Sequence, residues 1–170
     1  MISVAVIGGG ASGMAFAVAL KQKRPDIEVT VFEKNPKVLK KILVTGNGRC
    51  NILNFDAVAE NYFEACEFVR PAVEKYTPKK TEAIFRDMGL LLMSEQEGRA
   101  YPISQTAASV VCVLSSAAER AGVKVFTDTP VKSIKKSQGG FVINNDKSFN
   151  FAVIACGCAA APKQGTDGSS

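Results

Sequence analysis

The strongest constraint on the fold is a short glycine-rich stretch near the N-terminus, which reads VAVIGGGASG and places Gly8, Gly10 and Gly13 in a G-x-G-x-x-G arrangement. Residues 2–7 are apolar and mostly β-branched, which predicts a buried strand. Residues 11–23 are rich in alanine and other apolar residues that favour a helix. A glycine turn directly between a strand and a helix is typical of nucleotide-binding α/β folds.

Each glycine of the turn has its own predicted role. Gly8 permits a sharp turn, Gly10 lets a diphosphate approach the backbone without a Cβ in the way, and Gly13 allows the helix to pack closely on the strand. The start of the helix, at Ala11 and Ser12, offers unpaired N–H groups and the positive end of the helix dipole to a phosphate.

A second strand and an acidic residue complete the pattern. Residues 27–32, IEVTVF, are strong β-formers, so strand, turn, helix and strand form a βαβ unit with parallel neighbouring strands. Glu33 follows this strand, where a carboxylate can accept hydrogen bonds from the hydroxyls of an adenosine ribose. An acid here also disfavours a 2′-phosphate. These features together predict dinucleotide binding, and the alternative is a glycine turn in another kind of α/β protein.

The rest of the chain keeps the α/β character but changes its layout. The expected elements are a long connection (34–56), two helices (57–76 and 78–88), a hairpin (90–103), a helix (106–121), a strand (123–126) and an antiparallel meander (130–154) that leads into an apolar strand. A connection as long as the first is usually functional. We expect residues 57–103 to be a helical and hairpin insertion within a binding domain that covers residues 1–170.

Composition excludes several function classes. Of the 170 residues, 46% are hydrophobic and 22% charged, which is typical of a globular protein, and no apolar run is long enough to span a bilayer. The N-terminus lacks the features of a signal peptide, so we expect a cytoplasmic protein without membrane contact. There is no histidine, which excludes Ser-His-Asp nucleophile systems and imidazole zinc sites. No cysteine pair has C-x-x-C spacing, and we expect no metal site.

The net charge of +5 suits a phosphate-bearing cofactor. Nucleic-acid binding is the alternative, but the lysines are spread out and lack interleaved aromatic residues, so a solvated surface and a small-molecule substrate are favoured. The sequence leaves the oligomeric state undetermined.

The layout after the βαβ unit favours FAD over NAD. Simple NAD domains continue to alternate strand and helix, whereas this chain has a long insertion and a meander, and so resembles the FAD-binding fold of the glutathione-reductase type. In such folds Val131, on the first meander strand, would contact the adenine. The stretch that contains Ala155 and Gly157, VIACG, resembles the second fingerprint of these folds, where a strand runs under the cofactor.

Five motifs in order carry a more specific resemblance: VAVIGGGASGMAFA, VFEKN, KILVTGNGRCN, GRAYPISQTAASVV and VIACG followed by PKQGTDG. This series resembles the YhiN/BaiN-type flavoproteins, an aminoacetone-oxidase-like family of NAD(P)/FAD-dependent oxidoreductases. The resemblance implies a Rossmann-like FAD-binding fold with a parallel sheet and a small antiparallel β-meander. It also implies FAD as cofactor, NAD(P)H as a possible electron donor, and hydride transfer through the flavin N5 atom.

The GRCN loop is the most discriminating of these motifs. In the family it lines the cofactor cleft, so Gly46 and Gly48 would turn main-chain N–H groups towards the flavin or its phosphates. Arg49 would offer a forked cation, and Cys50 and Asn51 would lie near the ring or support the loop. Arg49 and Tyr101 are the polar candidates for catalysis. The predicted cofactor-binding residues are Gly8, Gly10, Ala11, Ser12, Gly13, Glu33, Lys34, Gly46, Gly48, Arg49, Cys50, Asn51, Val131, Ala155 and Gly157.

The chain departs from the family pattern in places. Leu39 stands in VLKK where the family usually has a glycine, Asn47 occupies the middle of the glycine loop, and Cys156 and Cys158 replace a hydroxyl residue and a glycine. Family members are more than twice as long, so we expect a truncated chain, the FAD-binding portion of an enzyme. The alternative is a non-catalytic module that binds FAD or NAD.

Overall fold

The computed structural model describes residues 1–157, which divide into two compact units. The first unit comprises Met1–Ile42 and the chain from Leu114 onward, and the second comprises Leu43–Val113. The predicted insertion, 57–103, falls inside the second unit, which extends beyond it on both sides. The PKQGTDG motif and Cys158 lie outside the described residues.

The predicted βαβ unit is confirmed and forms the centre of the first unit. Strand β1 spans Ser3–Ile7, helix α1 spans Ala11–Lys23 and strand β2 spans Glu28–Phe32. The two strands pair in parallel, with Val6 opposite Val31. Both strands are almost fully buried, as their continuous apolar sequences indicate.

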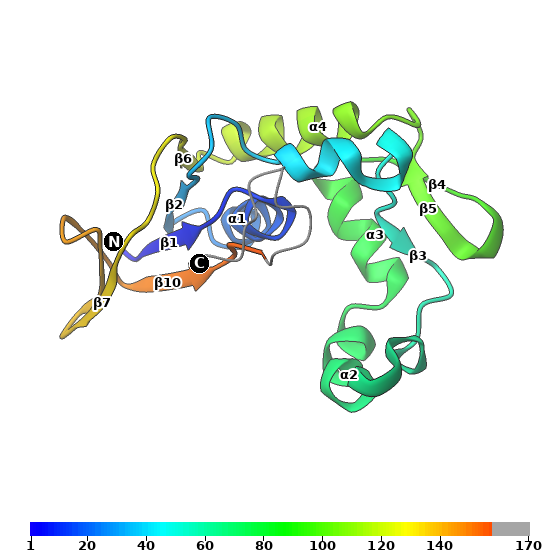
Figure 1. The fold of residues 1–170 in the computed structure, drawn as a ribbon, viewed down its shortest axis with the longest axis horizontal. Helices are drawn as coiled ribbons and strands as arrows, with labels where there is room; N and C mark the ends of the chain where they lie inside the picture. The colour runs from blue at the N-terminus through cyan, green and yellow to red at the C-terminus, as the bar shows by residue number, and fades with distance from the viewer. Residues whose placement is uncertain (158–170) are drawn as a thin grey trace. The chain divides into compact units, whose positions relative to one another are not determined.

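Two further strands complete a four-stranded parallel sheet (Figure 1). Strand β6, Lys124–Phe126, pairs with β2, which confirms the predicted third parallel strand. Strand β10, Phe151–Ile154, pairs with β1 on its other side, so the strand order is β10-β1-β2-β6. The chain therefore leaves β1 towards one side and returns much later on the other. Ligands of open α/β sheets bind at such a switch point, beyond the carboxyl ends of the strands.

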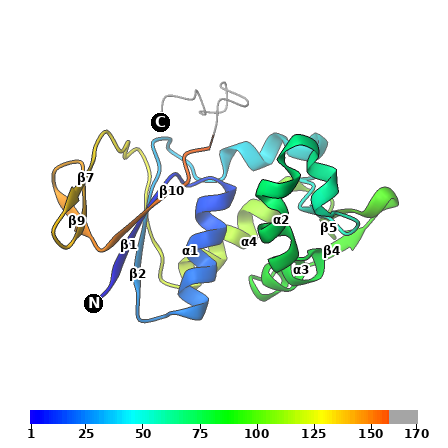
Figure 2. The same cartoon turned by 90° about the horizontal axis from the view of Figure 1, so that it is seen from below.

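The antiparallel meander is also confirmed. It consists of β7 (Ile134–Ser137), β8 (Gly140–Ile143) and β9 (Lys147–Phe149), and its second turn contains Asn144 and Asn145 with φ of 53° and 60°. Asparagine tolerates this left-handed conformation better than most residues do. Helix α1 covers one face of the parallel sheet and the meander lies on the other (Figure 2).

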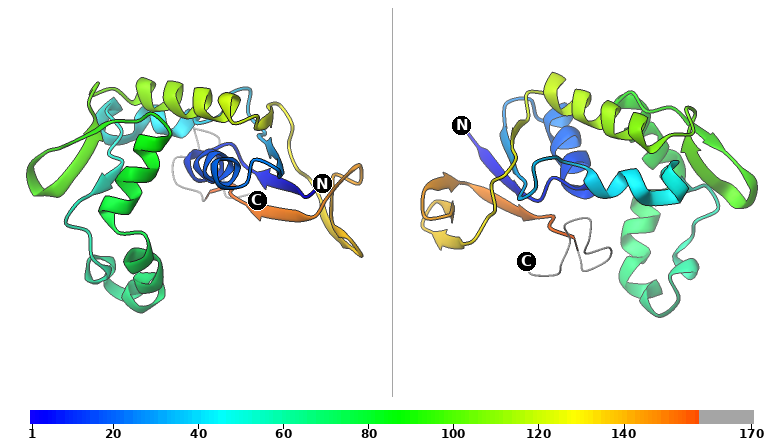
Figure 3. Two further views of the ribbon diagram at one scale, coloured as in Figure 1. Left: turned by 180° about the vertical axis from the view of Figure 1, so that it is seen from behind. Right: turned by 45° about the horizontal axis from the view of Figure 1, so that its top comes forward.

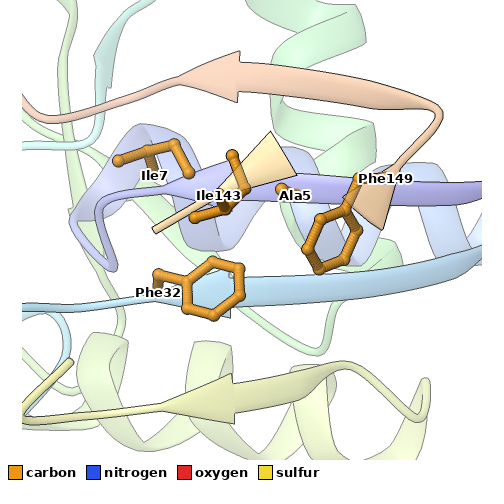
Figure 4. Packing of buried hydrophobic residues seen from close by; sticks show 5 residues of the cluster. All are labelled: Ala5, Ile7, Phe32, Ile143 and Phe149. Atoms are coloured by element: carbon orange, nitrogen blue, oxygen red, sulfur yellow. The ribbon is translucent and has the colours of Figure 1, made fainter. Parts of the chain in front are cut away.

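The meander is joined to the sheet by a hydrophobic cluster (Figure 4). Ala5, Ile7 and Phe32 project from the sheet towards Ile143 and Phe149 of the meander. The rings of Phe32 and Phe149 meet edge to face at a centroid distance of 5.8 Å. Burial of each large side chain contributes roughly 1.5–3 kcal/mol. Val131, in the segment before the meander, packs against the same cluster, so the cluster also holds that segment next to the sheet.

The second unit differs from the prediction over residues 57–76. A 3-10 helix, Ala59–Ala65, and helix α2, Cys66–Lys75, replace the expected single helix. The break lies at Phe63, whose φ of 43° is not helical and whose side chain is 87% exposed. No residue of α2 is buried. Apolar spacing predicts a continuous helix only where the stripe packs against something, and this stripe stays largely in solvent.

Strands β4 (Leu92–Ser94) and β5 (Arg99–Pro102) form the expected hairpin, shown in green in Figure 3, and helices α3 (Pro78–Asp87) and α4 (Ala107–Arg120) are also as expected. Residues 34–56, expected to be a long connection, contain two elements that were not predicted: the 3-10 segment Lys40–Gly48 and strand β3 (Leu53–Asn54), which pairs antiparallel with β5. A further 3-10 turn, Gln96–Gly98, lies between β4 and β5. Over residues 1–157, no helix combines the length and the apolar character that crossing a bilayer requires.

Candidate dinucleotide-binding site

A cavity of about 700 Å³ opens at the carboxyl ends of three parallel strands in the first unit. Ile7, Phe32 and Ile154, the last residues of β1, β2 and β10, line it. Its volume is in the range of small-molecule and cofactor sites. The cavity therefore occupies the place that the strand order marks for a ligand.

Two glycines of the turn are required by close packing. Gly8 has φ of +109°, and a Cβ there would overlap the carbonyl oxygen of Ala155 on the neighbouring β10 segment. A Cβ at Gly13 would overlap the carbonyl oxygen of Gly8 and would lie 3.3 Å from the Cβ of Ala155. The sharp turn and the close approach of helix to strand are thus both observed.

Gly10 serves a different purpose, because a Cβ at this position would have no atom within 4 Å. Gly10 is the N-cap of α1, and no side chain caps the helix. The first intrahelical bond runs from Met14 N to Gly10 O, so the N–H groups of Ala11, Ser12 and Gly13 precede it. The cavity is thus bordered by a helix N-terminus whose donors no side chain covers, with no acidic residue in the first turn.

Glu33 lies at the rim of the cavity with its side chain held by main-chain and amide donors. Glu33 is only 8% exposed. Oε2 accepts a hydrogen bond of 2.8 Å from Gly9 N, and Oε1 accepts bonds from Asn35 N and Asn35 Nδ2 at 2.8 and 2.7 Å. These bonds satisfy a buried carboxylate and fix its direction.

The segment after Glu33 is anchored to the glycine turn. Leu39 N donates to Gly9 O at 2.8 Å, and the Leu39 side chain is 1% exposed. Its φ of 60° lies in the left-handed region, which glycine adopts with less strain than leucine. The anchored segment brings lysines to the cavity, whose lining includes Lys34, Lys37, Lys40, Lys41 and Lys132 against the single acidic residue Glu33.

Nine of the predicted cofactor-binding residues line this one cavity: Gly8, Gly10, Ala11, Ser12, Glu33, Lys34, Val131, Ala155 and Gly157. Gly13 lies beneath the turn instead. One detail differs from the prediction, because Val131 precedes the first meander strand, which begins at Ile134. Contact of these residues with a cofactor stays a prediction.

Sequence analysis missed other lining residues, notably Gly9, Asn35 and Cys156. Gly9 could have been found, because the middle glycine of three in a row implies a backbone that another group approaches closely; a Cβ there would lie 3.1 Å from the Cβ of Glu33. Asn35 lies two residues after Glu33 and donates to Glu33 Oε1 from both its main chain and its side chain, which the sequence pattern did not indicate. The Cys156 thiol donates to Ile7 O at 3.6 Å, a contact that no local pattern reveals.

The GRCN loop belongs to the second unit, where left-handed residues give it a tight path. Gly46, Asn47 and Gly48 have φ of 53°, 54° and 79°. Arg49 N bonds to Gly46 O and Cys50 N bonds to Thr45 O, both at 3.0 Å. The loop is therefore built by its own main chain. Contact of Gly46, Gly48 and Asn51 with a cofactor stays a prediction.

Arg49 already has partners within its unit. Its Nη1 donates to both carboxylate oxygens of Glu95 at 2.9 and 3.1 Å and to Gln105 Oε1 at 2.9 Å. Its guanidinium lies 4.0 Å from the ring centroid of Tyr101, which is buried. This arrangement ties the loop to the β4–β5 hairpin. A catalytic role for Arg49 or Tyr101 stays a prediction.

Cys50 is a packing residue in this structure. The residue is 5% exposed, and burial raises the pKa of its thiol, with a smaller opposing effect from a hydrogen bond to Thr45. A thiol with a raised pKa stays protonated near neutral pH and is a poor nucleophile. This agrees with a role in supporting the loop.

Residues 2–170 match the HI0933-like protein Rossmann domain family over their whole length. The chain belongs to this family. Its fold and its resemblance to YhiN/BaiN-type flavoproteins agree with that assignment, and the expected Rossmann-like fold with a parallel sheet and a small antiparallel meander is confirmed.

Two curated proteins are similar to this HI0933-like chain. One is the 3-dehydro-bile acid delta(4,6)-reductase of Clostridium scindens, 38% identical over 173 residues, covering 99% of this chain and 42% of the relative. The other is the ribosomal RNA dihydrouridine synthase of Haemophilus influenzae, 26% identical over 149 residues, covering 87% of this chain and 35% of the relative. The chain therefore spans less than half the length of these curated relatives.

Solved structures share the fold. An oxidoreductase from Methanosarcina mazei superposes with a TM-score of 0.55 at 13% identity, covering 94% of this chain and 60% of its own. THI4 of Thermovibrio ammonificans has a TM-score of 0.54 at 16% identity, covering 84% of this chain and 45% of its own. At these identities the likeness concerns the fold alone.

Proposed function

We propose that this chain is the FAD-binding part of a flavin-dependent oxidoreductase. The observation that carries the proposal is the uncapped N-terminus of α1 beside a cavity whose rim holds the fixed carboxylate of Glu33. A diphosphate would accept hydrogen bonds from the N–H groups of Ala11 and Ser12, and the space in front of Gly10 admits it. Glu33 would accept from the adenosine ribose.

The charge of the cavity supports the same ligand. Five lysines and one acidic residue are among its described lining residues. A cavity lined by positive charge concentrates anionic ligands and strengthens their binding at low ionic strength. The lysines therefore complement the helix dipole in holding a diphosphate.

The meander favours FAD over NAD as the dinucleotide. Val131 is the residue that the resemblance to the glutathione-reductase type of fold expects beside the adenine, and it lines the cavity here. When bound, the flavin would supply hydride transfer through its N5 atom, while this chain binds and orients it. NAD(P)H is the proposed electron donor, and a cytoplasmic location suits it.

The names of the two relatives support a reaction class. One is a reductase named for delta(4,6) positions, and the other is named for dihydrouridine, which is uridine with two added hydrogens. We propose reduction of a carbon–carbon double bond by the whole protein. A small molecule is the favoured substrate, and uridine in RNA is the second candidate because of the second relative's name.

Flavin binding is tested by reconstituting the purified chain with FAD and measuring the bound flavin by its visible spectrum and by mass spectrometry. Gly10→Val should block the diphosphate, and Glu33→Ala should weaken binding roughly tenfold to a hundredfold by removing a charged acceptor. Gly139→Val is the matched control for the first variant, because a Cβ at Gly139 also meets open space but lies outside the cavity. Glu28→Ala is the control for Glu33→Ala, because Glu28 is the first residue of β2 and Glu33 directly follows that strand.

Undiminished flavin content in both Gly10→Val and Glu33→Ala would contradict the proposal. A non-catalytic dinucleotide-binding module is the alternative function. Bleaching of bound flavin by NADH or NADPH under anaerobic conditions supports the oxidoreductase. Adenine nucleotide bound in place of flavin, without such bleaching, supports the module.

A further inference from the structure

The carboxylate of Glu33 is held from two directions. Gly9 N donates to Oε2 at 2.8 Å from the glycine turn. Asn35 contributes the other two bonds, one from its main chain at 2.8 Å and one from Nδ2 at 2.7 Å, and both end on Oε1. The side-chain amide of Asn35 is therefore a dedicated partner of Glu33, and Asn35 itself lines the same cavity.

Counting acceptor sites shows what this arrangement leaves for a ligand. Each carboxylate oxygen can accept about two hydrogen bonds. Oε1 receives two bonds from Asn35, and Oε2 receives one from Gly9. One acceptor position therefore remains on Oε2, which suits a single ribose hydroxyl rather than both.

Without the Asn35 side-chain amide, the Glu33 carboxylate would lose one of the three hydrogen bonds that hold it in this geometry. A glutamate side chain has three rotatable bonds and loses substantial rotamer freedom when it is fixed. Because three donors already hold the two carboxylate oxygens before a ligand arrives, the loss of rotamer entropy does not reduce the free energy of ligand binding. An aspartate at position 35 would instead place a second carboxylate against the first and disfavour this geometry.

We propose that Asn35 is a positioning residue that presets Glu33 for recognition of one ribose hydroxyl, and so determines the preference of the site for ribose. This inference rests on the proposed dinucleotide function. It adds to that function a residue outside the glycine turn and the acid, and it predicts single-hydroxyl recognition.

The test compares three probes on the 170-residue chain by isothermal titration calorimetry: ADP, 2′-deoxy-ADP and 3′-deoxy-ADP. In the wild type one deoxy analogue should bind roughly tenfold more weakly than ADP, and the other should bind about as well as ADP. Asn35→Ala should reduce that tenfold gap to about twofold or less. Asn35→Asp should weaken ADP binding further than Asn35→Ala does.

The ratio of affinities within one variant is the decisive quantity, because a general loss of stability does not change it. Asn35→Ser serves as a second variant if Asn35→Ala folds poorly, as judged by circular dichroism. Asn150→Ala is the matched control, since Asn150 Oδ1 accepts a 2.8 Å bond from Ser3 N in the same unit, outside the cavity. This control should keep the tenfold gap.

The outcomes separate the inference from the function on which it rests. A wild-type gap that Asn35→Ala and Asn35→Ser both retain would overturn the role of Asn35 and leave dinucleotide binding intact. Equal losses for both deoxy analogues in the wild type would overturn the single-hydroxyl geometry. Failure of the wild type to bind ADP and FAD alike would overturn the proposed function itself.

Discussion

Adding one methyl group at Gly13 should destabilise the fold much more than adding the same group at Gly10. Both glycines belong to one turn, but their surroundings differ. Gly13 is buried, and a Cβ there would overlap the carbonyl oxygen of Gly8 and approach the Cβ of Ala155 to 3.3 Å. A Cβ at Gly10 would have no neighbour within 4 Å, and φ of −78° at Gly10 is accessible to alanine.

The magnitude follows from two opposing effects at Gly13. Alanine in a helix interior is favoured over glycine by about 1 kcal/mol. Overpacking costs roughly 1–3 kcal/mol, and the upper end applies here because the obstructing atom is main chain in a tight turn. We therefore expect Gly13→Ala to lower the free energy of unfolding by about 2 kcal/mol. For a chain of this size that corresponds to a fall in Tm of roughly 4–8 °C.

Gly10→Ala exchanges one N-cap residue for a poorer one, which costs about 0.5 kcal/mol. The assay is thermal and urea unfolding followed by circular dichroism, with both variants and the wild type measured in the absence of nucleotide. A Gly13→Ala variant as stable as the wild type would refute the packing argument. So would a Gly10→Ala variant destabilised as much as Gly13→Ala.

Three further predictions concern residues around the site. Leu39→Gly should relieve about 1 kcal/mol of left-handed backbone strain, but it also removes a leucine side chain that is 1% exposed, whose loss costs at least about 2.7 kcal/mol. Urea unfolding should therefore show a net loss of stability, and a variant as stable as the wild type would contradict this reasoning. Arg49→Met should cost about 1 kcal/mol, and Glu95→Gln should couple with it in a double-mutant cycle; strictly additive effects would argue against the ion pair. Burial raises the pKa of the Cys50 thiol in the folded state, so its stabilising contribution is complete below about pH 8.5 and declines as the pH rises and the unfolded thiol ionises. The stability difference between wild type and Cys50→Ala, measured from pH 7 to about pH 10, should shrink; a constant difference would refute it.

The sequence by itself determined the βαβ unit, the turn and the place of Glu33. These features are local: β-branched runs, helix-forming residues and the backbone freedom of glycine act within a few residues of each other. The positions of Gly8 and Gly13 could be interpreted correctly because the turn requires them whatever the rest of the chain does. The meander was equally predictable, since its turn residues lie directly between short strands.

Only the tertiary structure decided how distant segments meet. It placed β10 beside β1 and brought Lys132 together with the lysines of residues 34–41 around one cavity. It formed the ion pair between Arg49 and Glu95, which lie 46 residues apart in the sequence. It also broke the predicted helix at Phe63, because periodicity does not reveal whether an apolar stripe finds a partner. Such outcomes depend on packing and charge between segments far apart in sequence, which no local propensity encodes.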